Sequence, residues 1–180
     1  MKLTSMLAAL AALAVLTGCE SPAPSLISLE PVATAKDTAF DNGLIGTWEE
    51  QADKDLIAII RRADSGGYQI SAVSSGAVLS FQAQMFRLGD DEFLDISPAD
   101  DNDFRIPGHA VMRLWISGSS LRWAFLDSDW LKEQITALAT HNSDGKMQLF
   151  SPTAAVRAFI AANGADEKAY GKTATWQRIP

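Results

Sequence analysis

The sequence has almost no cysteine, since Cys19 is the only one among its 180 residues. A single cysteine excludes an intrachain disulfide, so the chain cannot be one of the small exported domains that disulfides stabilise. It also excludes a zinc site built on several thiolates. The two histidines, His109 and His141, lie far apart in the sequence and form no ligand-spaced pair. We therefore expect neither a metal nor another cofactor.

The chain is also poor in basic residues, with 15 Lys and Arg against 22 Asp and Glu and a formal net charge of −7. Proteins bind nucleic acids and anionic lipid surfaces through basic patches, so this balance argues against both kinds of partner. The apolar run over residues 6–16 is shorter than the ~20 residues that a membrane-spanning helix needs. We expect no transmembrane helix.

The first residues have the features of an export signal. Lys2 precedes the apolar run, which ends in Leu16-Thr17-Gly18-Cys19. This ending resembles the lipobox of bacterial lipoproteins, and the alternative is an ordinary secretory signal followed by a chance cysteine. The position of the cysteine, directly after a pair of small residues, favours the lipobox. The resemblance implies a signal peptide over residues 1–18, cleavage before Cys19 and lipid on its thiol.

Lipid on Cys19 would make the membrane the first partner of this protein, because two or three acyl chains form a lasting anchor. The residue after the cysteine is Glu20 rather than an aspartate, which resembles lipoproteins sent to the outer membrane. We therefore expect a place in the cell envelope, on the periplasmic face of the outer membrane. Removing residues 1–18 takes away one lysine and no acid, so the formal net charge becomes −8.

The rest of the chain divides into a tether and one domain. Residues 19–38 are rich in Ser, Pro and Ala without periodicity, which predicts a flexible tether. Residues 39–180 have the length of a single domain.

Short β-rich runs separated by turns dominate this domain. They occupy residues 44–50, 55–62, 68–74, 78–87, 92–97, 109–116, 121–127, 146–150 and 173–179. Two helices interrupt them. The first spans residues 129–138 after Ser128 as N-cap, and the second follows Ser151 as N-cap and Pro152, and ends before Gly164. Neighbouring strands without βαβ alternation predict an antiparallel up-and-down barrel of eight or nine strands with two short helices.

Gly46-Thr47-Trp48 resembles the Gly-x-Trp signature on the first strand of lipocalins and related calycin barrels. In those barrels the tryptophan lies across the closed end, under a basic side chain from a late strand. The resemblance implies that Arg178 stacks over Trp48, as a structural pair held by a cation–π contact. The alternative is an unrelated small β-barrel or sandwich with a tryptophan in its core.

An eight-stranded barrel is wide enough either to be filled by side chains or to hold one small ligand. Alternation along the strands predicts an inward wall for an apolar ligand formed by Phe81, Met85, Met112, Leu114 and Trp123. We therefore expect a non-enzymatic binding module for a small apolar ligand. The alternative is a structural lipoprotein with a filled barrel, which contacts another envelope protein through an outer face near Trp115 and Arg122.

Two other groups of residues allow weaker hypotheses. Asp95 and His109 are on neighbouring strands and could form a carboxylate–imidazole pair, which serves either as a general base or as a structural hydrogen bond. No serine or cysteine nucleophile lies in a recognisable motif near them. Residues 98–103 are rich in aspartate but lack the alternation and glycine of a calcium loop, so we interpret them as a solvated acidic loop.

Overall fold

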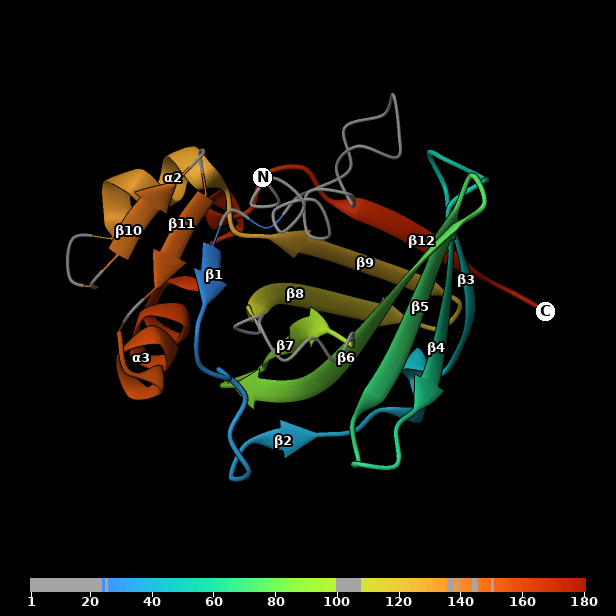
Figure 1. Ribbon diagram of the computed structural model, residues 1–180, viewed down its shortest axis with the longest axis horizontal. Helices are drawn as coiled ribbons and strands as arrows, with labels where there is room; N and C mark the ends of the chain where they lie inside the picture. The colour runs from blue at the N-terminus through green and yellow to red at the C-terminus, as the bar shows by residue number, and fades with distance from the viewer. Residues whose placement is uncertain are drawn as a thin grey trace, which may run out of the picture.

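Eight antiparallel strands form a closed barrel at the centre of this computed structural model (Figure 1). The structure describes residues 24, 26–99, 108–135, 138, 140–143, 146–149 and 151–180. The barrel strands are β3 (Gly46–Glu50), β4 (Ile57–Arg62), β5 (Tyr68–Ser74), β6 (Ala77–Leu88), β7 (Asp91–Pro98), β8 (Ala110–Ser117), β9 (Ser120–Phe125) and β12 (Ala174–Ile179). Each strand from β3 to β9 pairs with the next, and β12 lies between β9 and β3, which closes the sheet. This confirms the predicted up-and-down barrel.

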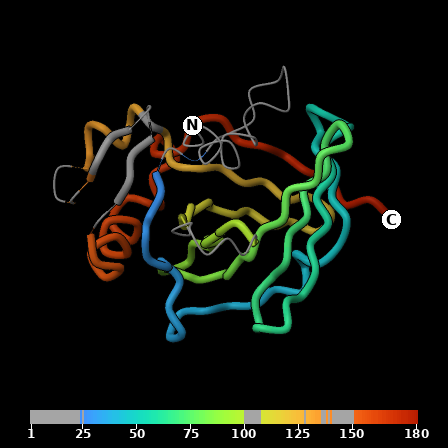
Figure 2. The backbone as a smooth tube through the Cα atoms, viewed as in Figure 1, coloured from blue at the N-terminus to red at the C-terminus, as the bar shows by residue number. Residues whose placement is uncertain are grey.

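The remaining elements lie outside the barrel wall. A strand of two residues, β2 (Thr38–Ala39), pairs with β6. A three-stranded sheet of β1 (Leu26–Ser28), β10 (Thr140–Ser143) and β11 (Lys146–Leu149) stands beside the barrel with helices α2 (Ser128–Gln134) and α3 (Thr153–Asn163) (Figure 1). The backbone tube in Figure 2 shows β1 between α3 and the barrel. Two short 3-10 helices, η1 (Asn42–Leu44) and η2 (Glu167–Ala169), precede β3 and β12. The predicted strand over residues 146–150 therefore exists, but it belongs to this side sheet.

Turn residues explain why the strands begin and end where they do. The turn between the predicted runs 109–116 and 121–127 is a tight hairpin, with Ser117 paired to Ser120 and Gly118 at a φ of 59°. Glycine adopts this left-handed backbone conformation without a side-chain clash, which lets the chain reverse within two residues.

Both predicted helices are present, but both predicted N-caps are wrong. The carboxylate of Asp127 caps α2 by accepting from the amides of Asp129 and Trp130, so Ser128 is already the first helical residue. Pro152 occupies the N-cap position of α3 and has no side-chain acceptor to offer, which moves Ser151 outside the helix. Asp competes well with Ser for the cap position because its carboxylate also favours the positive end of the helix dipole.

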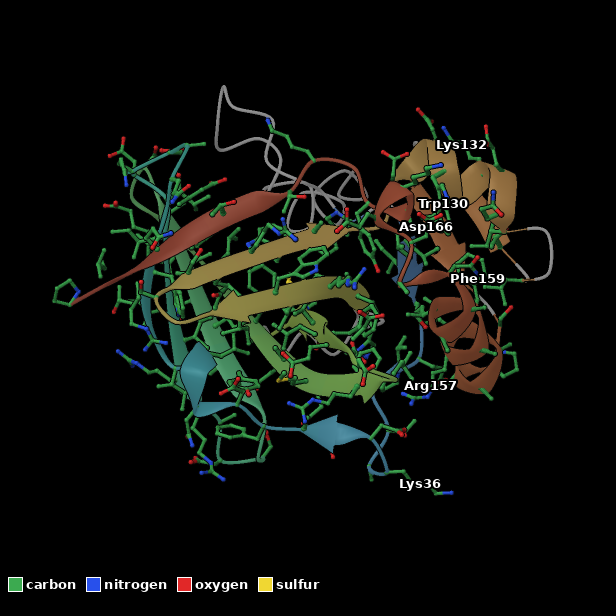
Figure 3. All side chains as sticks on the ribbon, turned by 180° about the vertical axis from the view of Figure 1, so that it is seen from behind. Lys36, Trp130, Lys132, Arg157, Phe159 and Asp166 are labelled. Atoms are coloured by element: carbon green, nitrogen blue, oxygen red, sulfur yellow. The ribbon has the colours of Figure 1, made fainter. Side chains whose placement is uncertain are left out.

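The part of the predicted tether that the structure describes lies against the domain. Val32 is fully buried, and the guanidinium of Arg157 on α3 donates to its carbonyl oxygen over 2.8 Å and to Asp37 over 2.5 Å (Figure 3). Thr153 donates to the carbonyl of Pro31 over 2.9 Å. Residues 26–38 are thus an ordered strap rather than a flexible spacer, because their backbone groups bind side chains far away in the sequence.

The described residues form two hydrophobic clusters, one on each side of the barrel wall. The first fills part of the barrel interior and includes Trp48, Tyr68 and Met112. The second lies between the outer face of the barrel and the helices, where Phe86 and Phe93 meet Val156 and Ile160 of α3. Within the described residues, no helix combines the length and apolar character needed to cross a bilayer.

Candidate binding cavity in the barrel

One end of the barrel is closed by Trp48 and the residues around it. Trp48 is completely buried, and its indole nitrogen donates to the carbonyl of Leu44 over 2.9 Å. The guanidinium carbon of Arg178 lies 4.6 Å from the centroid of the Trp48 ring, and the same group donates to the carbonyls of Ile45 and Gly43. The pair that the Gly-x-Trp resemblance implied is therefore in contact. It ties β12 to the chain that crosses this end.

Gly46 is required here by the position of Arg178. Its φ is +150°, and a Cβ atom built on it would lie 2.9 Å from Nη1 of Arg178. A side chain at this position would push the guanidinium off the Trp48 ring. The two residues of the motif therefore act together: Gly46 leaves room for the Arg178 guanidinium, and Trp48 provides the ring on which that guanidinium stacks.

Tyr68 completes the closed end from β5. Its ring stacks on Phe40 at 4.8 Å, and its hydroxyl accepts from the amide of Asp41 over 2.7 Å. Burial, the largest cause, raises the pKa of Tyr68 above its ordinary value of 10.0. The sulfur of Met85 lies 3.7 Å from this hydroxyl, so Met85 packs beneath the closed end.

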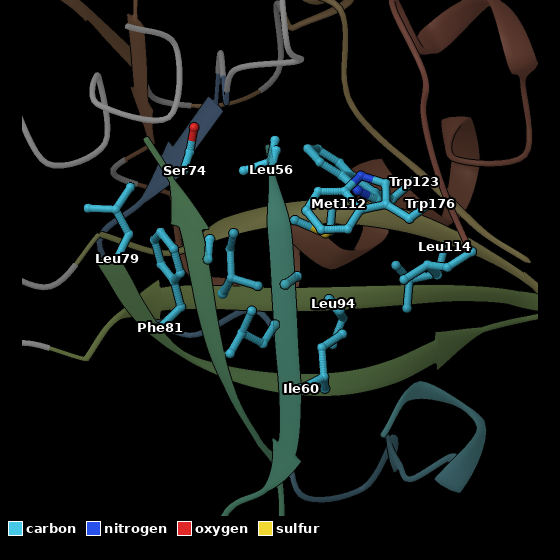
Figure 4. Close-up of a pocket in the computed structure, with 15 residues that line it drawn as sticks. Leu56, Ile60, Ser74, Leu79, Phe81, Leu94, Met112, Leu114, Trp123 and Trp176 are labelled. Carbon is cyan, nitrogen blue, oxygen red and sulfur yellow. The ribbon is translucent and has the colours of Figure 1, made fainter. Parts of the chain in front are cut away.

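A cavity of about 100 Å³ occupies the rest of the interior (Figure 4). Its wall is apolar and comes from seven of the eight strands together with the residue before β4. An empty apolar cavity of ~150 Å³ can take up benzene, so this somewhat smaller space is on the scale of a short chain or a single small ring. The lining residues are Leu56, Ala58, Ile60, Ile70, Ala72, Ser74, Leu79, Phe81, Leu94, Ile96, Met112, Leu114, Leu121, Trp123 and Trp176.

Four of the five residues predicted for this wall line the cavity, namely Phe81, Met112, Leu114 and Trp123. The fifth, Met85, faces inward but lies at the closed end with Tyr68, because β6 is long enough to pass beyond the cavity. Other wall residues could have been found from the same signal. Ile70, Ala72 and Ser74 alternate along β5 and line the cavity.

Asp95 and His109 do meet, but on the outer face of the barrel. Nδ1 of His109 lies 2.8 Å from Oδ1 of Asp95. The other carboxylate oxygen accepts from the amides of Val32 and Ala33 over 2.6 and 2.9 Å. Both oxygens therefore hold structural hydrogen bonds, and neither side chain lines the barrel cavity. The arrangement matches the structural hydrogen bond considered above and fastens the strap to β7.

Trp115 points outward as its parity predicts and is half-buried. It lies between the guanidinium groups of Arg113 and Arg122, at 4.8 and 4.5 Å from its centroid, and meets the edge of Tyr170. Arg113 is itself buried, pairs with Asp91 and donates to the carbonyl of Gly164 over 2.8 Å. Burial, partly opposed by the nearby Arg113 charge, raises the pKa of Tyr170 to about 12.

Cys19 and residues 100–107 lie outside the described residues, so the structure does not bear on the lipid attachment or the acidic loop. In the described part of the chain, no three His, Cys, Asp or Glu side chains gather as metal ligands. Comparison of the sequence and structure with known protein families, curated proteins and solved structures found no match in any of the three.

Proposed function

We propose that this protein is a lipid-anchored envelope lipoprotein with a lipocalin-like barrel that binds a small apolar ligand. The supporting observation is the cavity of about 100 Å³, walled by apolar side chains from around the barrel. An apolar ligand that enters such a space removes its own surface from water, which favours binding by ~25 cal/mol per Å². The Trp48–Arg178 pair at the closed end supports the proposed likeness to lipocalins.

The strap limits how far the domain can stand from a lipid anchor. The first strand, β1, begins at Leu26, seven residues after Cys19. Seven residues span at most ~25 Å when fully extended. If Cys19 carries lipid, the barrel works close to the membrane surface, where apolar molecules are concentrated.

Ligand binding is tested by filling the cavity with a side chain. Ala72 lines the cavity, and Gln69 on the same strand is exposed. We expect Ala72→Phe to abolish binding of methylcyclohexane, measured by NMR chemical-shift titration of the full chain, while Gln69→Phe leaves it unchanged. Binding that survives Ala72→Phe, or absent binding by the unsubstituted protein, would contradict a ligand site in the barrel.

The anchor is tested separately by replacing its only candidate residue. Cys19→Ala removes the thiol that would carry lipid, so we expect the protein to move from the membrane fraction to the soluble fraction. Mass spectrometry of the unsubstituted protein should show the added mass of the acyl chains on Cys19. An unmodified Cys19, or unchanged fractionation of the variant, would refute the lipoprotein assignment without affecting the ligand site.

A further inference from the structure

Three buried polar atoms without a hydrogen-bond partner occur on the inward face of the barrel. They are Oε2 of Glu50, Oγ of Ser74 and Nε1 of Trp176, and their residues are 5%, 1% and 5% exposed. The only other such atom among the described residues, Nε of Arg113, is on the outer wall. Buried polar atoms in folded proteins are nearly always bonded, so three in one region require an explanation.

The three residues belong to one row across neighbouring strands. Trp176 on β12 is directly opposite Glu50 on β3. The amide of Glu50 donates to the carbonyl of Leu56, which precedes β4, over 3.1 Å. Ile57 on β4 pairs with Val73 on β5. One step further in this antiparallel register, Leu56 is opposite Ser74, so Ser74 follows Leu56 in the row.

Part of this row, without Glu50, lines the cavity at the end away from Trp48. Leu56, Ser74 and Trp176 line the cavity, and Figure 4 shows them at the same end of it. Glu50 is two residues after Trp48 on β3, and both side chains are buried. The interior therefore changes from a closed, hydrogen-bonded end at Trp48 to an end where buried polar atoms without hydrogen-bond partners lie among apolar side chains.

The three groups differ in what they can bind. An indole N–H only donates, a hydroxyl donates or accepts, and an ionised carboxyl only accepts. Burial, the largest cause, and the charge of Asp53 raise the pKa of Glu50, while Lys172 lowers it. The carboxyl is thus short of solvation, and a ligand group that donates to it would restore a hydrogen bond.

We propose that the cavity selects apolar molecules with one neutral hydroxyl, which accepts from the Trp176 indole N–H and donates to the Glu50 carboxyl. This inference rests on the proposed ligand-binding function and adds the chemical class of the ligand. Side chains directly opposite on paired strands have Cβ atoms ~4.5–5.5 Å apart, so one ligand oxygen can reach both groups. Ser74 offers a further hydroxyl at the same end.

Ligands with other head groups would form fewer or less favourable hydrogen bonds with these three polar atoms. An ammonium group cannot accept from the indole N–H, and a carboxylate would place a second anion beside Glu50 in a chain of net charge −7. A hydrocarbon leaves all three atoms unpaired. A hydroxyl alone both accepts and donates without adding a charge.

Four cyclohexyl compounds with matched rings test this selectivity in the full chain. They are methylcyclohexane, cyclohexylmethanol, cyclohexylmethylamine and cyclohexanecarboxylate, titrated at neutral pH by NMR chemical shifts and by tryptophan fluorescence, since Trp123 and Trp176 line the cavity. We expect the alcohol to bind more tightly than the amine or the carboxylate. Trp176→Phe and Glu50→Leu should each weaken alcohol binding about 3- to 10-fold more than they weaken methylcyclohexane binding, the usual effect of one lost hydrogen bond.

Two variants serve as controls. Trp115→Phe makes the same change on the outer wall and should alter no affinity. Glu50→Gln keeps an acceptor oxygen and the shape of the side chain, so it should retain most of the alcohol affinity even if Glu50→Leu fails to fold. Equal alcohol affinity in Trp176→Phe and the unsubstituted protein, or tightest binding by the amine, would overturn this inference. Absence of methylcyclohexane binding by the unsubstituted protein would instead overturn the proposed function.

Discussion

The guanidinium of Arg178 covers the indole ring of Trp48 at 4.6 Å and also donates to the carbonyls of Ile45 and Gly43. Trp48 and Arg178 are directly opposite each other on β3 and β12, the strands whose pairing closes the barrel. This contact therefore stabilises both the closed end and the junction between the first and last strands of the barrel.

Replacing Arg178 with methionine should destabilise the protein by about 2–4 kcal/mol, because a cation–π contact and two hydrogen bonds to carbonyl groups are lost. Urea unfolding followed by tryptophan fluorescence measures the change. Arg61→Met is the control, since Arg61 is exposed on β4 and its replacement should change the free energy of unfolding by no more than ~0.5 kcal/mol. Equal stability of the two variants would mean that the Arg178 contact contributes nothing to folding.

Asp95→Ala should release the strap from the barrel. The amides of Val32 and Ala33 both donate to this buried carboxylate, so removing it leaves two donors without their partner, at a cost of about 2–4 kcal/mol. We expect faster hydrogen–deuterium exchange at Val32 and Ala33 than in the unsubstituted protein. Asp64→Ala, a change at an exposed turn residue, should leave their exchange unaltered. Unchanged protection in Asp95→Ala would show that the strap is held by other contacts.

Glu50 should make the free energy of unfolding depend on pH. Burial and Asp53 raise its pKa above 4.5 in the folded protein, against the effect of Lys172, so folding disfavours the ionised carboxyl. Stability contributed by the protonated form is therefore lost as the pH rises from the unfolded value through the folded one. The free energy of unfolding of Glu50→Gln should exceed that of the unsubstituted protein by about 1 kcal/mol at pH 7.5, with no such gain at pH 4. Glu49→Gln, on the same strand, should show no such pH-dependent gain in urea titrations. A gain from Glu50→Gln that is equal at both pH values would contradict the raised pKa.

Tyr170 should remain protonated far into the alkaline range. Burial raises its pKa to about 12, so the unfolded chain, with an ordinary value of 10.0, loses this proton first. The contribution of Tyr170 to stability is therefore lost as the pH rises from about 10 through 12. Absorbance titration at alkaline pH should resolve two tyrosines, both above the ordinary value, and Tyr170→Phe should remove the step near 12. A step near pH 10 in the folded protein that disappears in Tyr170→Phe would refute this assignment.

The sequence by itself determined the barrel. Alternating apolar residues in short runs, separated by turns such as the one at Gly118, require a two-sided antiparallel sheet, and such a sheet avoids open edges by closing. The same alternation identified Phe81, Met112, Leu114 and Trp123 as inward residues, because side chains on a strand face opposite sides in turn.

Only the tertiary structure decided which inward residues border empty space and which polar groups lack a partner. Met85 shares the parity of Phe81 but packs under Tyr68, since depth along the barrel axis depends on strand length and register. The sequence did not predict the strap at Val32 either, because its backbone binds Asp95 and Arg157, more than 60 residues away in the chain. The row of Glu50, Ser74 and Trp176 comes from three strands, and only their pairing brings it together.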